Sequence, residues 1–191
     1  LQFRLTSKFL KLGQPRIRNR ALTECALPAM RRRRDECRET VQIGVRNGEE
    51  GVSVEVLDGL FPLRISVEPG LRFKLYNNAP GKCLLALLSP TERDELIDRL
   101  ELFSCTPRTI TDRSALREEC VRIVDRGYST DHAEADDGIH CVAAPVFDRH
   151  RRIIASIWIS APSRRLPKDS FATIGRQVVL AADEVSEELK R

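Results

Sequence analysis

The segment from Gly127 to Asp148, GYSTDHAEADDGIHCVAAPVFD, gathers more chemically active side chains than any other stretch of the chain. Two histidines, a cysteine and four carboxylates precede an apolar run that contains a proline. Side chains of these types can form a nucleophile with its base, a metal site, or the polar wall of a pocket that binds a small molecule. The spacing of the residues decides among these three kinds of site.

Cys141 is the candidate nucleophile, and His140 precedes it directly. Neighbouring residues of a strand point to opposite faces of the sheet, so His140 cannot readily deprotonate the thiol. The remaining bases are His132 and His150, which are expected in a loop and in a turn. This arrangement favours a buried, inert cysteine over a cysteine hydrolase, so no catalytic residue is assigned and the chain is not expected to be an enzyme.

Six residues able to ligate a metal lie within the eleven positions from 131 to 141, namely Asp131, His132, Glu134, Asp136, His140 and Cys141. Their spacing matches no closed zinc pattern, and carboxylates in such a loop are usually solvated. The six cysteines form no CxxC pair, which is typical of reduced thiols in a cytosol. We therefore predict neither a metal nor another cofactor.

The stretch NNAPGKC ends in Gly81-Lys82 like a phosphate-binding loop. It has a single glycine and no Ser or Thr after the lysine, so a nucleoside triphosphate is not expected there. Backbone N–H groups from Ala79 to Lys82 can instead bind a carboxylate at the start of a helix. Capping of the helix by its own chain is the alternative reading, and the sequence leaves both open.

Alternating apolar residues predict the strands that position these groups. Val41 to Val45 and Val52 to Val56 alternate around the turn NGEEG, which is the pattern of an antiparallel hairpin. A strand from Ile139 to Pro145 and a returning strand from about 152 to 161 follow, joined by DRHR. On the last strand one face carries Ile153, Ala155, Ile157 and Ile159, and the other Ile154, Ser156, Trp158 and Ser160.

Capping residues and helical periodicity predict the helices. One begins near Pro80, one follows the capping box Ser89 to Glu92, one runs from Asp112 to Gly127, and the last covers about 169–190. Another is expected from Arg16 to about Arg38, kinked at Pro28, with the run Arg31 to Arg34 on a solvated face. No run approaches the roughly 20 apolar residues of a membrane helix. This order of elements predicts one α+β domain, an antiparallel sheet covered by helices.

Several stretches together resemble the IclR family of bacterial transcription regulators. They are FRLTSKFLKLG, ETVQIGV, APGKCLLALL, TPRTITDRSAL, VDRGYSTDHAEADDGIHCVAAPVFD and ASIWISAPSRRL, in the family's order and across nearly the whole chain. The resemblance implies a GAF-like effector-binding domain at 14–191. Residues 1–13 would be the end of a wing (Phe3 to Leu5) and a linker helix (Thr6 to Leu12) of a winged helix-turn-helix domain, whose recognition helix the chain lacks.

The resemblance also implies partners and a site. A small organic or aromatic acid would be the effector, operator DNA would be bound through the missing N-terminal domain, and the cytoplasmic regulator would be a homodimer or homotetramer. Carried over residue by residue, the effector site comprises Phe73, Ala79, Pro80, Gly81, Asp131, Ile139, Cys141, Trp158 and Ser160. Trp158 departs from relatives with a small hydroxyl residue there, which implies a smaller pocket or one suited to a planar ligand.

Two alternatives remain open at this point. The first is a GAF-like thiol enzyme that uses Cys141, and the second is a redox or metal sensor that uses Cys141 with His132 and Glu134.

Overall fold

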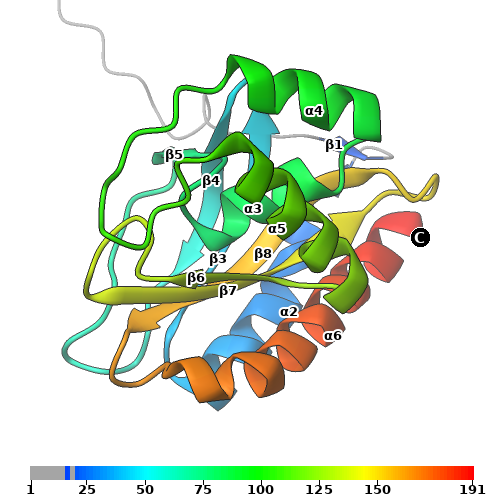
Figure 1. Cartoon of the computed structure of the whole chain (residues 1–191). Helices are drawn as coiled ribbons and strands as arrows, with labels where there is room; N and C mark the ends of the chain where they lie inside the picture. Colours follow the sequence, from blue (N-terminus) through cyan, green and yellow to red (C-terminus); the bar gives the residue numbers. More distant parts are fainter. Residues whose placement is uncertain (1–15, 18–19) are drawn as a thin grey trace, which may run out of the picture.

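The computed structural model describes residues 16–17 and 20–191, so the expected wing strand and linker helix at 1–13 lie outside the described residues. Its centre is a six-stranded antiparallel sheet with the strand order β5-β4-β3-β8-β7-β6 (Figure 1). The strands are β3 (Thr40–Asn47), β4 (Glu50–Leu57), β5 (Arg72–Lys74), β6 (Ser129–His132), β7 (Ile139–Phe147) and β8 (Ile153–Pro162). The expected α+β class is confirmed.

The predicted hairpin is strands β3 and β4. Asn47 pairs with Glu50, and Gly48 takes the left-handed φ of 65° that the tight turn requires. Strand β3 also pairs with β8, and β8 pairs with β7 along its whole length. The two strands that carry the chemically active residues, β7 and β8, therefore lie inside the sheet with neighbours on both sides.

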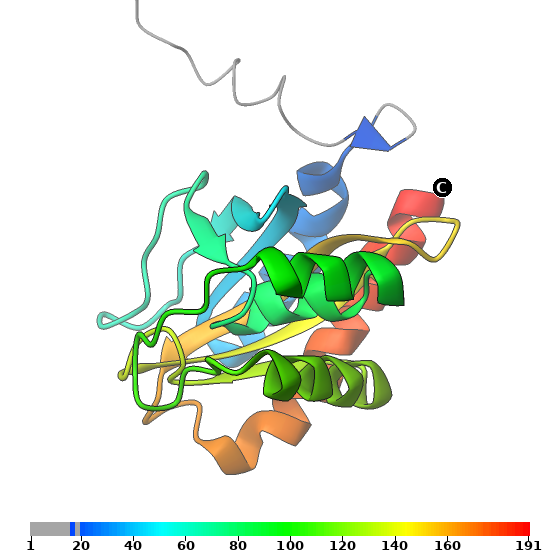
Figure 2. The same ribbon diagram turned by 45° about the horizontal axis from the view of Figure 1, so that its top comes forward.

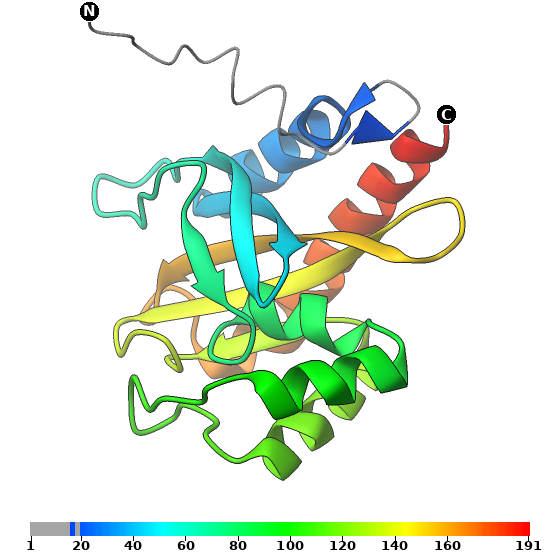
Figure 3. The ribbon, with the colours of Figure 1, turned by 90° about the horizontal axis from the view of Figure 1, so that it is seen from above.

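Helices cover both faces of the sheet (Figures 2 and 3). On one face lie α2 (Leu22–Cys37) and α6 (Phe171–Lys190), and on the other lie α3 (Ala79–Ala86), α4 (Pro90–Arg99) and α5 (Arg113–Arg126). A short 3-10 helix, η1 (Lys168–Ser170), precedes α6. The apolar stripe of α6, including Val178, Val185 and Leu189, packs on the sheet in the larger core. No helix in the described part of the chain is long and apolar enough to cross a membrane.

Local signals set the helix ends as expected. Asn78 caps α3, and Ser89 caps α4 by accepting the N–H of Glu92 at 3.3 Å. Asp112 caps α5 through the N–H of Ala115 at 2.7 Å, and Gly127 ends that helix with a φ of 80°. Each cap satisfies backbone groups that the helix itself cannot pair.

The N-terminal helix is shorter than predicted. Residues 16–17 (β1) and 20–21 (β2) form a two-stranded antiparallel pair, and α2 begins only at Leu22. Helical spacing of apolar residues continued through this pair, but the backbone groups bond across the two strands instead. The arginine run is also not wholly solvated, because the side chain of Arg33 is only 13% exposed.

Two further differences come from pairing between distant segments. Strands β5 and β6 have three and four residues, and each sits at an edge of the sheet. The register of β7 and β8 shifts between Val146 and Phe147, so Phe147 pairs with Ile153 and Ile154 is the extra residue. This bulge reverses the first two positions of β8: Ile154 packs toward α2 and α6, and Ile153 packs on the opposite side.

Candidate functional site

A small cluster on the sheet face that α3 covers contains most of the residues singled out in the sequence. We call it the Trp158 cluster: Ala79, Cys83, Cys141, Ala143 and Trp158 are buried together, and Phe73, Ile139 and Ile153 pack against them. The strand pairing explains the grouping, because Ala143 pairs with Trp158 and Cys141 pairs with Ser160. Paired residues point to the same face, here the one covered by α3.

Two glycines make room for the aromatic side chains of the cluster. A Cβ at Gly44 would lie 3.0 Å from the Trp158 ring, and a Cβ at Gly51 would lie 2.0 Å from the ring of Phe73. The two rings meet edge to face with centroids 5.5 Å apart. Phe73 comes from the three-residue edge strand β5 and is only half-buried, whereas Trp158 is 4% exposed.

A line of polar groups runs through this apolar surrounding. Gln42 Nε2 donates to Ser160 Oγ at 3.1 Å, and Ser160 Oγ shares a hydrogen bond with Cys141 Sγ at 3.2 Å. Asp131 pairs with Cys141 in the register and is 2% exposed. Burial raises the pKa of Asp131 from 3.8 to about 7, against the lowering effect of the hydrogen bond from the Glu134 N–H. Asp131 therefore carries a proton in much of the protein at neutral pH.

The start of α3 borders the cluster but has few free donors. Gly81 N–H donates to Asn78 Oδ1 at 2.8 Å, and Lys82 N–H donates to the Asn78 carbonyl at 3.0 Å. Pro80 has no N–H, so the turn from 79 to 82 is left with the N–H of Ala79 to offer an anion. Gly81 is required by close packing, since a Cβ there would lie 2.2 Å from the carbonyl oxygen of Lys74.

A buried ion pair fixes the acidic loop over α3. Lys82 Nζ donates to both carboxylate oxygens of Glu134 at 2.5 Å, with side-chain exposures of 1% and 9%. Asp131 Oδ1 accepts the backbone N–H of Glu134 at 2.7 Å, so the loop is tied to the cluster twice. The charge of Lys82 is thus neutralised by Glu134, and the carboxylates of the loop do not form a separate set of metal ligands.

His132 and His140 lie on the other face of the sheet. His132 pairs with His140, their ring centroids are 4.8 Å apart, and His140 Nδ1 is 2.7 Å from the carbonyl oxygen of Leu166. Both rings also contact Phe171 of α6. His140 therefore cannot act as the base for Cys141, as expected from the alternation along the strand.

This placement gives no support to the two alternatives built on Cys141. Burial, followed by the nearby charge of Asp131, raises the pKa of Cys141 well above 9.0, so the thiol is protonated and unreactive. In the part of the chain that the structure describes, no group of three or more His, Cys, Asp or Glu side chains is arranged to hold a metal ion.

The structure thus brings Phe73, Ala79, Ile139, Cys141 and Trp158 into one cluster, joins Ser160 and Asp131 to its polar side, and sets Pro80 and Gly81 at its border. Sequence analysis did not include Gln42, Cys83 or the Lys82–Glu134 pair. The pairing of Gln42 with Trp158 across β3 and β8 places the Gln42 side chain on the same sheet face as the cluster. No local signal in the sequence predicts that pairing.

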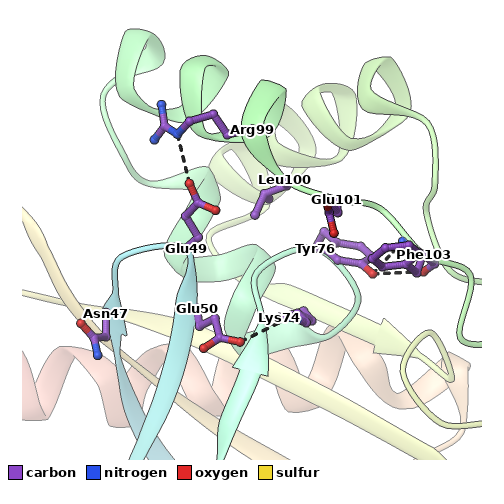
Figure 4. Close-up of a pocket in the computed structure, with 9 residues that line it drawn as sticks. All are labelled: Asn47, Glu49, Glu50, Lys74, Tyr76, Arg99, Leu100, Glu101 and Phe103. Atoms are coloured by element: carbon purple, nitrogen blue, oxygen red, sulfur yellow. Dashed lines mark hydrogen bonds and ion pairs between the residues drawn. The ribbon is translucent and has the colours of Figure 1, made fainter.

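Cavities of the described residues lie away from this cluster. A cavity of about 430 Å³ opens between the β3–β4 turn, β5 and the end of α4 (Figure 4). Most of its charged groups are already paired: Glu49 with Arg99 at 3.1 Å, and Glu50 with Lys74 at 3.3 Å. Tyr76 Oη bonds to the backbone of Phe103. None of the nine predicted residues lines this cavity.

Fold and cluster together define an α+β domain that buries a cluster of polar and apolar side chains between its sheet and α3. The family model described as "Bacterial transcriptional regulator IclR C-terminal" matches residues 14–187. The chain belongs to the IclR family, as the sequence motifs indicated.

Named relatives agree with this assignment. The chain is 32% identical to the HTH-type transcriptional regulator BhcR of Paracoccus denitrificans over 174 residues, covering 91% of this chain and 62% of BhcR. It is 30% identical to KdgR of Escherichia coli over 188 residues, covering 98% of this chain and 72% of KdgR. The chain thus spans about two thirds of the length of these relatives. They are transcriptional regulators and not enzymes, which confirms that expectation.

Solved structures give the same result for the fold. The IclR protein of Thermotoga maritima superposes with a TM-score of 0.86 and 28% identity, covering 97% of this chain and 75% of that one. The inducer-binding domain of PobR from Acinetobacter, a double mutant in complex with 3-hydroxybenzoic acid, superposes with a TM-score of 0.78 and 23% identity. It covers 87% of this chain and 98% of that one.

Proposed function

We propose that this domain senses a small organic acid at the Trp158 cluster and controls the operator binding of an IclR-type regulator. One observation carries the proposal: the connected polar groups of Gln42, Ser160 and Cys141, with Asp131 beside them, lie buried in an otherwise apolar cluster. Buried polar groups that line an apolar site fix the orientation of a ligand and give it specificity. The nine predicted residues are the proposed effector site.

Phe73 is the proposed gate of this site. The side chains of the cluster are packed together, so a ligand must displace one of them to enter. Phe73, Ile139 and Ile153 are its half-buried members, and of these Phe73 lies on the shortest strand, which only three residue pairs hold to the sheet. Trp158 is held on both sides by β3 and β7 and stays in place. Movement of Phe73 would open the face of Trp158 to a planar ligand.

The proposed effector is a small, anionic molecule with a flat apolar body. The PobR domain, which has this fold, holds a hydroxybenzoic acid in its crystal structure. Here Ser160 and the N–H of Ala79 would bind the ligand oxygens, and Asp131 would bind through its protonated form. An ionised Asp131 would repel the same anion, so binding should strengthen as the pH falls below about 7.

The proposed signal passes through the N-terminal segment. Residues 1–13 would connect the effector domain, residues 14–191, to a winged helix-turn-helix domain that binds operator DNA in the cytoplasm. We propose a homodimer or homotetramer, in which the effector favours one quaternary arrangement over another. A difference in affinity worth roughly 1 to 3 kcal/mol between the two arrangements is enough for such control.

A panel of organic and aromatic acids, screened for a rise in melting temperature, tests this proposal. A genuine ligand should lose affinity in Ser160→Ala and in Trp158→Ala, and should retain it in Ser114→Ala, which alters an exposed serine of α5. A ligand whose affinity is the same in all three variants would place the effector site elsewhere.

A further inference from the structure

A second cavity lies on the opposite face of the sheet from the Trp158 cluster. It measures about 480 Å³, within the range of small-molecule sites, and lies between the end of α2, the start of α6 and the loop after β4. We call it the Arg33 cavity; the residues that matter here are Arg33, Phe61, Ile159, Arg165, Leu166 and Ile174. Ile159 follows Trp158 directly on β8, so the two sites are separated by the sheet itself.

Arg33 brings an unused hydrogen-bond donor to this cavity. Its side chain is 13% exposed, and its Nη1 pairs with Glu36 at 2.9 Å. The Nε of Arg33 is buried and has no hydrogen-bond partner among the described residues. This nitrogen is covered by protein atoms in the structure, so an acceptor in the cavity reaches it only when the Arg33 side chain turns. A buried donor without a partner is unfavourable, and pairing it with an acceptor would favour that movement.

The other charges at the cavity are already compensated. Arg165 forms a bidentate ion pair with the buried carboxylate of Glu39 and also donates to the carbonyl oxygen of Leu63 at 2.8 Å. Glu36 is 57% exposed, so solvent screens its charge at Arg33. A bound carboxylate would therefore meet a positive group at Arg33 and no uncompensated buried negative group.

An aromatic wall and three aliphatic side chains supply an apolar surface. Two guanidinium groups contact the ring of Phe61, with the Arg165 Cζ 4.5 Å and the Arg38 Cζ 5.2 Å from the ring centroid. These contacts hold the ring in place. Ile159 and Leu166 are buried and Ile174 is half-buried. The cavity thus has, beside its apolar wall, an arginine with one hydrogen-bond donor that lacks a partner among the described residues.

We propose that the Arg33 cavity binds a second small molecule, a monocarboxylate with an apolar or aromatic body. The Arg33 side chain turns toward the cavity, the carboxylate accepts a hydrogen bond from its Nε, and the body packs on Phe61, Ile159 and Leu166. This site is independent of the proposed effector site, and it assigns a role to Arg33, whose side chain is 13% exposed and more buried than that of Arg34 at 26%.

Phenylbutyrate and its neutral counterpart phenylbutanol are suitable probes, measured by calorimetric titration on the whole chain. Phenylbutyrate should bind the wild type more tightly than phenylbutanol. Arg33→Met should weaken phenylbutyrate roughly tenfold or more, the loss expected for one charge-assisted hydrogen bond. Arg31→Met removes an exposed arginine of the same helix and should leave the affinity unchanged. Gln177→Trp, at the half-exposed rim, should block the cavity while Arg33 stays in place.

The fluorescence of Trp158, the only tryptophan of the chain, separates this site from the effector site. Phenylbutyrate bound in the Arg33 cavity leaves the emission unchanged because the ring lies across the sheet. Three results would overturn the proposal: no phenylbutyrate binding in the millimolar range, equal affinity in Arg33→Met and the wild type, or binding that changes Trp158 emission and survives Gln177→Trp. The last result would assign the ligand to the Trp158 cluster.

Discussion

Replacing Asp131 with asparagine should make the stability of the domain less sensitive to pH. Burial raises the pKa of this carboxyl from 3.8 to about 7 in the folded protein. Between these two values the unfolded chain loses its proton while the folded one keeps it, so the wild type becomes less stable as the pH rises. From about pH 5 to about pH 7 this amounts to two pKa units, or about 3 kcal/mol of unfolding free energy.

Asparagine keeps the acceptor for the Glu134 N–H but has no proton to lose, so Asp131→Asn should lack this decline. Urea denaturation at a series of pH values measures the difference. The unfolding free energies of variant and wild type should diverge by about 3 kcal/mol between about pH 5 and pH 7 and stay parallel above about pH 8. The control Asp125→Asn alters an exposed carboxylate of α5 and should follow the wild type. Parallel curves for Asp131→Asn throughout would refute the assignment of a buried, protonated carboxyl.

Three further variants test the packing around the site. Gly81→Ala should destabilise the domain by about 2 kcal/mol in chemical denaturation, because the clash of the new Cβ with a backbone oxygen outweighs the gain of about 1 kcal/mol in helix propensity; greater stability would contradict this packing. Lys82→Met should cost about 3 kcal/mol or more by leaving Glu134 buried without its partner, and Lys82→Met/Glu134→Leu should recover part of that loss. In native protein, iodoacetamide should modify exposed Cys105 well before buried Cys141, as measured by mass spectrometry. The reverse order would support the hypothesis of a thiol enzyme.

Sequence analysis found the elements that local signals define. The caps at Ser89 and Asp112 and the turn at Gly48 act within a few residues, so their chemistry can be read from neighbours in the chain. The edge strands β5 and β6 are too short for a periodic pattern, and they exist because β4 and β7 offer them free backbone groups. The bulge at Val146 depends in the same way on how β7 and β8 pair.

The candidate site likewise combines residues that local patterns predict with residues that only long-range contacts bring in. Alternation along β8 placed Trp158 and Ser160 on one face, and the structure joins them there with Cys141. Gln42 and the Lys82–Glu134 pair could not be found, since 118 residues separate Gln42 from Ser160 and 52 separate Lys82 from Glu134. The Arg33 cavity is likewise formed by segments far apart in the chain, and the charge run alone indicated a solvated surface.

The emission of Trp158 tests the central proposal most directly, because the chain has no other tryptophan and this one lies in the proposed effector site. Any acid that raises the melting temperature as an effector should also change the emission of Trp158, and both changes should saturate with the same dissociation constant. In Ser160→Ala the two titrations should shift together to higher ligand concentration. An acid that stabilises the protein at saturation while the Trp158 spectrum stays unchanged would contradict effector binding at this cluster.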